Sequence, residues 1–71
     1  MWITITTDQE REKLFDLDKI VGVTTYANKN VGAYELRLHT VSHKFDIYFK
    51  SELELNNEYN RIKQLLTKGT L

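Results

Sequence analysis

Residues 34–50, YELRLHTVSHKFDIYFK, alternate apolar and polar side chains on both sides of a Val-Ser step. Alternation of this kind is typical of a half-buried antiparallel hairpin. If the chain turns at Val41–Ser42, each apolar residue of one strand faces an apolar residue of the other. The expected pairs on this apolar face are Leu38–Phe45, Leu36–Ile47 and Tyr34–Phe49. A shift of one residue would turn the whole set to the wrong face, so the pattern determines the register.

The second face of the same hairpin, called the polar face below, carries charged side chains together with one tyrosine. Its expected opposite pairs are Glu35–Tyr48, Arg37–Asp46 and His39–Lys44, and Lys50 lies on the same side. Arg37 and Asp46 form an opposite-charge pair, which contributes from a few tenths of a kcal/mol to about 1 kcal/mol. We expect the polar face to remain open to solvent or to a partner.

The two histidines of the chain, His39 and His43, raise the question of a metal site. On a helix, their spacing would place both rings on one side, as a shared metal ion requires. On the hairpin, His39 belongs to the polar face, whereas His43 has the parity of the apolar face at the tip. The chain has no cysteine to form a thiolate site or a disulfide. We therefore predict no metal site and no cofactor.

The whole chain predicts an α+β fold, in which an antiparallel β-meander of four to five strands carries one C-terminal helix packed on its apolar face. The expected strands lie near residues 2–6, 14–17, 20–27, 33–40 and 43–50, and the expected helix near residues 52–68. Ser51 followed by Glu54 matches a capping box at the helix start. Asn56 and Asn57 are weak helix formers, so we expect an interruption in the first turn. The apolar positions that recur at helical spacing are Leu55, Tyr59, Ile62 and Leu66.

The third expected strand, residues 20–27, is apolar on both of its faces. Val21 and Val23 lie on one face, and Ile20 and Tyr26 on the other. A strand of this kind commonly lies in the middle of a sheet or at a subunit contact.

Size and charge restrict the function further. Seventy-one residues form a single domain, 1–71, with a small core. Disulfides are excluded, so stability has to come from an unusually good core or from self-association, and we favour self-association. Ten basic and ten acidic side chains cancel, which argues against duplex nucleic acid as a partner. No apolar run reaches membrane length and the first residues do not resemble a signal peptide, so we expect a soluble, cytoplasmic protein.

The available chemistry does not suggest a catalytic centre. Ser51 is expected to cap the helix, and Ser42 lies in a turn beside His43, so no nucleophile has an oriented base. We predict that the protein is not an enzyme. Trp2 and Tyr26 are candidate interface residues, because exposed aromatic side chains are frequent at interaction hot spots. The candidate ligand-binding residues, which suit a phosphate or nucleotide, are Arg37, His39, Lys44 and Tyr48.

These features predict a small non-enzymatic interaction protein that self-associates and binds or inhibits another protein through a sheet face or edge. In size and style the chain resembles the short proteins of phages and mobile elements, some of which block a host protein or sequester a signalling molecule. No motif carries this resemblance. One alternative is a protein that holds a small anionic or nucleotide-like ligand at a subunit interface. The second alternative is a weak binder of single-stranded nucleic acid on the polar face.

Overall fold

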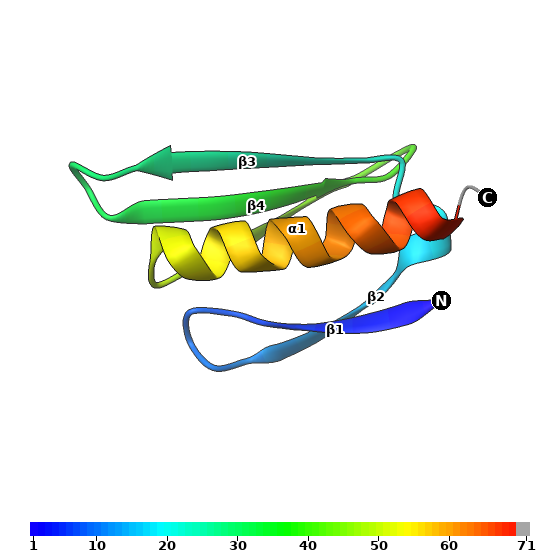
Figure 1. Ribbon diagram of the computed structural model, residues 1–71, viewed down its shortest axis with the longest axis horizontal. Coiled ribbons are helices and arrows are strands. Elements are labelled where there is room, and N and C mark those ends of the chain that lie inside the picture. The colour runs from blue at the N-terminus through cyan, green and yellow to red at the C-terminus, as the bar shows by residue number, and fades with distance from the viewer. Residues whose placement is uncertain (70–71) are drawn as a thin grey trace.

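The computed structural model describes residues 1–69 and contains five strands, a short 3₁₀ helix and one long α-helix (Figure 1). The 3₁₀ helix η1 (Leu17–Lys19) separates the second strand from the third, and α1 (Glu52–Gly69) follows the fifth strand. Neighbouring strands pair antiparallel. The α+β class and the C-terminal helix are therefore confirmed. The strands are β1 (Trp2–Thr6), β2 (Glu12–Asp16), β3 (Gly22–Asn28), β4 (Ala33–His39) and β5 (Lys44–Phe49).

The hairpin of β4 and β5 has the predicted register. Leu36 lies opposite Ile47 on the apolar face, and Arg37 lies opposite Asp46 on the polar face. At the tip, the N–H of Thr40 donates to the carbonyl of His43 at 2.9 Å, which closes the turn over the Val-Ser step. The alternation of side chains therefore determined the register over the full length of the hairpin.

The strands form two sheets instead of one continuous meander. β3, β4 and β5 make a three-stranded sheet in that order, while β1 and β2 pair with each other. The β1–β2 hairpin joins β5 through the N–H of Asp8, which donates to the carbonyl of Tyr48 at 2.8 Å. Nη2 of Arg61 in α1 donates to the carbonyl of Thr4 at 2.9 Å. β3 lies at the edge of its sheet, which excludes the mid-sheet position for this strand, and the alternative of a subunit contact stays a prediction.

The second strand begins and ends earlier than expected, and Leu17 belongs to η1. The Asp16 carboxylate explains this boundary, because it accepts a hydrogen bond from the N–H of Asp18 at 3.1 Å and caps the 3₁₀ turn. The N–H of Leu17 donates to the carbonyl of Met1 at 2.8 Å, and the Leu17 side chain is buried. Local capping by an aspartate thus ends the strand although the apolar alternation continues.

The α1 helix begins as the capping box predicts. The N–H of Glu54 donates to the Ser51 hydroxyl at 3.2 Å, and the Glu54 carboxylate accepts from the N–H of Lys50 at 3.2 Å. The helix continues without a break through Asn56 and Asn57, so the expected interruption was wrong. Burial of apolar residues on either side of the two asparagines outweighs their weak helix propensity.

The core lies where α1 packs against the strands. Figure 1 shows α1 running between β3–β4 and the β1–β2 hairpin. Phe45 departs from the expectation that the helix covers the apolar face. It is partly exposed and packs edge-on against Phe15 of β2, with ring centroids 5.6 Å apart. The buried residues of the core are Ile3, Ile5, Leu17, Leu36, Leu38, Ile47, Phe49, Leu55 and Ile62.

Candidate functional site

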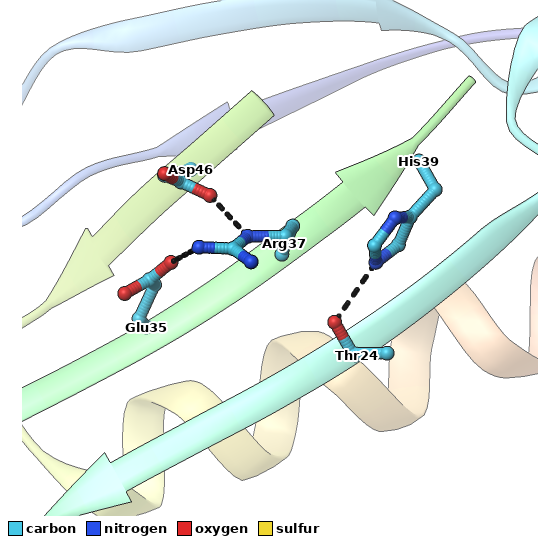
Figure 2. Close-up of polar contacts among 5 residues, drawn as sticks. All are labelled: Thr24, Glu35, Arg37, His39 and Asp46. Carbon is cyan, nitrogen blue, oxygen red and sulfur yellow. Dashed lines mark hydrogen bonds and ion pairs between the residues drawn. The ribbon is translucent and has the colours of Figure 1, made fainter. Parts of the chain in front are cut away.

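The polar face lies on the side of the three-stranded sheet that is opposite to α1 (Figure 2). Arg37 donates from Nε to Asp46 at 2.7 Å and from Nη2 to Glu35 at 3.2 Å. The hydrogen bond from Arg37 lowers the pKa of the Asp46 carboxyl, and the same hydrogen bond raises the pKa of the Arg37 guanidinium. Two carboxylates therefore already balance this guanidinium, and an anionic ligand would compete with them.

The other three candidate ligand-binding residues lie on the same face. Nε2 of His39 shares a hydrogen bond with the hydroxyl of Thr24 on β3 at 3.0 Å, as Figure 2 shows. Lys44 lies opposite His39, and Tyr48 lies opposite Glu35. Both Lys44 and Tyr48 are exposed. The hairpin thus brings the predicted donors and the aromatic ring onto one surface, and ligand binding by this surface stays a prediction.

The two histidines lie on opposite sides of the hairpin, as predicted. The ring of His43 stacks on Phe45 with centroids 6.3 Å apart, and its Nδ1 shares a hydrogen bond with the hydroxyl of Ser42 at 2.8 Å. The ring of His39 instead contacts Thr24 on the polar face. Within residues 1–69, no group of three or more His, Cys, Asp or Glu side chains is placed to hold a metal ion.

A second surface is a hollow of about 610 Å³ between the β2–η1 segment and the turn from β4 to β5. Four large apolar side chains around it are exposed: Leu14 (63%), Val21 (67%), Val41 (93%) and Phe45 (42%). Exposed apolar side chains that gather on one surface mark interaction sites more often than isolated ones do. We call this surface the apolar hollow; its lining residues are Leu14, Phe15, Asp16, Asp18, Lys19, Ile20, Val21, Thr40, Val41, Ser42 and Phe45.

Ionic contacts beside the hollow engage two of its acidic residues. The N-terminal ammonium of Met1 lies 2.9 Å from the Asp18 carboxylate and 3.7 Å from that of Asp16. The hydrogen bond to Asp18 raises the pKa of this amino group. Because the two acidic side chains have a cationic partner, the apolar residues dominate the character of the hollow.

The two candidate interface residues, Trp2 and Tyr26, belong to different surfaces. Leu14 lies opposite Thr4, so Trp2 and Leu14 share one face of the β1–β2 hairpin as diagonal neighbours. Trp2 is exposed, and it extends the apolar surface beyond the hollow. Tyr26 is exposed on the polar side of β3, where its hydroxyl accepts a hydrogen bond from Nδ2 of Asn28 at 3.3 Å.

The sequence-based reasoning did not identify the hollow. The sequence feature that best indicates the hollow is Val41, an apolar residue in a hairpin turn, where Asn, Asp and Gly are usual. The sequence predicts a strand at Leu14 without indicating which face this residue occupies, and it predicts that Val21 lies within the third strand, which in the structure begins at Gly22. The convergence of these residues depends on the packing of the β1–β2 hairpin beside β5, which is a tertiary contact.

Comparisons with protein-family models, with curated proteins and with solved structures find no match to this chain. Within residues 1–69, no helix has both the length and the apolar character needed to cross a membrane. A functional interpretation therefore rests on the two surfaces themselves.

Proposed function

We propose that this protein is a small, non-enzymatic binding domain that docks a segment of another protein in the apolar hollow. The observation that best supports this function is the exposure of Leu14, Val21, Val41 and Phe45 around one hollow. Covering these side chains removes apolar surface from water, which contributes about 25 cal/mol per Å². The hollow has a volume within the range of small-molecule pockets, about 300–1,000 Å³, so the choice between a compound and a protein segment depends on the exposed residues around it.

The arrangement of the exposed residues favours a protein segment over a small molecule. A compound that fills the hollow would leave Trp2 in water, because Trp2 does not line the hollow, and it would leave much of Val41 in water, because this side chain is 93% exposed. A protein segment lying across the hollow would cover walls and rim together. Apolar and aromatic side chains in the centre of such a contact commonly carry most of the binding energy.

The rim also indicates the chemistry of the partner. Lys19 and Asp18 line the hollow and remain exposed, although Asp18 is already paired with the Met1 ammonium, so charged groups of both signs lie beside the apolar residues. A polar rim around an apolar centre is the usual composition of a protein–protein contact. We therefore expect the partner to present one or two large apolar side chains flanked by charged residues of both signs.

Self-association belongs to the same proposal. It is supported by the small core and by the open edge of β3, and it would leave the hollow free for the partner.

A small anionic or nucleotide-like ligand on the polar face is the second candidate. It is supported by the common face of Arg37, His39, Lys44 and Tyr48. Arg37 already forms ion pairs with Asp46 and Glu35, so we rank this ligand below the docking function. Single-stranded nucleic acid on the polar face would have to compete with the same two carboxylates.

Affinity capture from cells with three forms of the protein tests the docking function. The forms are the wild type, the double variant Leu14→Lys/Val41→Lys, and the control Leu53→Lys. Leu53 is an equally exposed leucine on α1 and lies outside the hollow. A partner that is captured by the wild type and by the control, but not by the double variant, supports docking in the hollow. Equal capture by all three forms contradicts it.

A further inference from the structure

The outer edge of β3 is open. β3 pairs with β4 along one side, and no strand within residues 1–69 pairs with its other side. Figure 1 shows β3 along the margin of the molecule. The opposite edge of the sheet, at β5, is instead joined to the β1–β2 hairpin by the hydrogen bond from Asp8 to Tyr48. Alternate residues of β3 therefore direct unpaired N–H and C=O groups outward.

This edge lacks the features that usually prevent pairing with another chain. Monomeric proteins commonly protect an edge strand with lysine, proline or a very short strand. β3 has seven residues, GVTTYAN, with no charged residue and no proline. Lys29 follows the strand, but its Nζ lies 3.3 Å from the Glu52 carboxylate on α1. The edge is thus long and uncharged.

We propose that β3 pairs antiparallel with β3 of a second copy, so that two three-stranded sheets become one sheet of six strands. This deepens the self-association part of the proposed function and is independent of the hollow, which no β3 residue lines. A two-fold axis at Thr25 pairs all seven residues of the strand, from Gly22 opposite Asn28 inward. Every other antiparallel register leaves strand residues unpaired.

The resulting pairs favour a second copy as the occupant. Thr25 lies opposite Thr25 of the second copy, and Thr24 lies opposite Tyr26. Pairs of threonine, and pairs of an aromatic with a β-branched residue, are favourable across strands. Because β3 carries no charge, two identical strands meet without repulsion. The pairing also covers Tyr26, which is exposed in the single chain and was a candidate interface residue.

Charge substitutions at Thr25 test both the pairing and its register. Thr25 is exposed in the single chain, so Thr25→Lys and Thr25→Glu are expected to fold. In the dimer, either substitution places two like charges directly opposite each other, which we expect to weaken association up to about fivefold. Mixing the two variants in equal amounts places opposite charges there and is expected to restore a mixed dimer. The control is Thr4→Lys, at an exposed threonine of β1.

Native mass spectrometry at high micromolar protein concentration gives the outcome. We expect a dimer for the wild type and for Thr4→Lys, a clearly smaller dimer fraction for each Thr25 variant alone, and the mixed dimer for their combination. A monomeric wild type, a dimer that Thr25→Lys leaves unchanged, or a mixture without mixed dimer would overturn the pairing. Capture of the partner by Thr25→Lys, at a protein concentration where this variant is monomeric, would show that the hollow binds independently of the dimer, so the two proposals can fail separately.

Discussion

The replacement of Ile62 by alanine tests the packing of α1 against the sheets. Ile62 is fully buried at 0% exposure, in the middle of the helix. An isoleucine or leucine truncated to alanine in a core costs about 2–5 kcal/mol. A domain of 71 residues is expected to have a total stability of about 4–11 kcal/mol. Ile62→Ala therefore removes a large part of the stability, whereas Ile62→Val, at about 0.5–1.5 kcal/mol, leaves a folded protein.

The control is Leu53→Ala on the same helix. Leu53 is exposed, and both variants introduce the best helix former, so neither variant weakens the helix through its propensity. An exposed substitution stays within about 0.5 kcal/mol. In a domain of this size each kcal/mol shifts the melting temperature by about 4–8 °C. We expect Ile62→Ala to lower the melting temperature by about 8 °C or more, Ile62→Val by about 2–12 °C, and Leu53→Ala by less than about 4 °C.

Thermal unfolding by circular dichroism at one fixed protein concentration measures these shifts. The concentration has to be constant because self-association itself raises the melting temperature. If Ile62→Ala and Leu53→Ala melt within a few degrees of each other, α1 does not pack as described. The reasoning about the core would then be refuted together with the position of the helix.

Three further predictions concern the ion pair, the helix cap and the polar face. The pKa of Asp46 is lower in the folded than in the unfolded chain, so its pair with Arg37 stabilises the fold above the unfolded pKa of about 3.8. This contribution to the free energy of unfolding is lost as the pH falls through the lower folded pKa. Unfolding measured at a series of acidic pH values should therefore show a smaller loss of stability in Arg37→Met than in the wild type. An equal loss in the two proteins would contradict the pairing. Ser51→Ala should lower the free energy of unfolding by about 1 kcal/mol through loss of the helix cap, as measured by urea unfolding, whereas Ser51→Asp should keep the stability of the wild type. A Ser51→Asp variant as unstable as Ser51→Ala would contradict the cap. If the polar face binds an anionic ligand, a nucleotide or inorganic phosphate should raise the melting temperature and Arg37→Ala should abolish the rise; no rise with any of them would contradict this second candidate.

The hairpin of β4 and β5 could be predicted because the residues that determine it lie close together in the sequence. Apolar and polar side chains alternate over residues 34–50, and only one register pairs Leu36 with Ile47 and Arg37 with Asp46. The structure has this register. The start of α1 was equally predictable, because the side chains of Ser51 and Glu54 accept hydrogen bonds from backbone N–H groups within one turn. In both cases residues close in sequence determine the structure.

The division into two sheets was not predictable in the same way. It depends on how the β1–β2 hairpin docks, through Asp8 on Tyr48 and through Arg61 on Thr4, and these contacts join distant segments. The apolar hollow follows from this docking, so it was missed as well. Ligand candidates such as Arg37 were correctly assigned to one face, but the sequence could not reveal that the Arg37 guanidinium contacts two carboxylates at once.

Site-specific photo-crosslinking tests the docking function most directly. Val41 is replaced by a photoreactive phenylalanine derivative, since this side chain is 93% exposed at the hollow and its replacement leaves the core intact. The same replacement at Leu53, on the exposed side of α1, is the control. We predict that the probe at Val41 crosslinks in cells to an apolar segment of one partner protein, and that the probe at Leu53 does not. Crosslinking at Val41 that never exceeds the level at Leu53 would contradict the proposal that the hollow binds another protein.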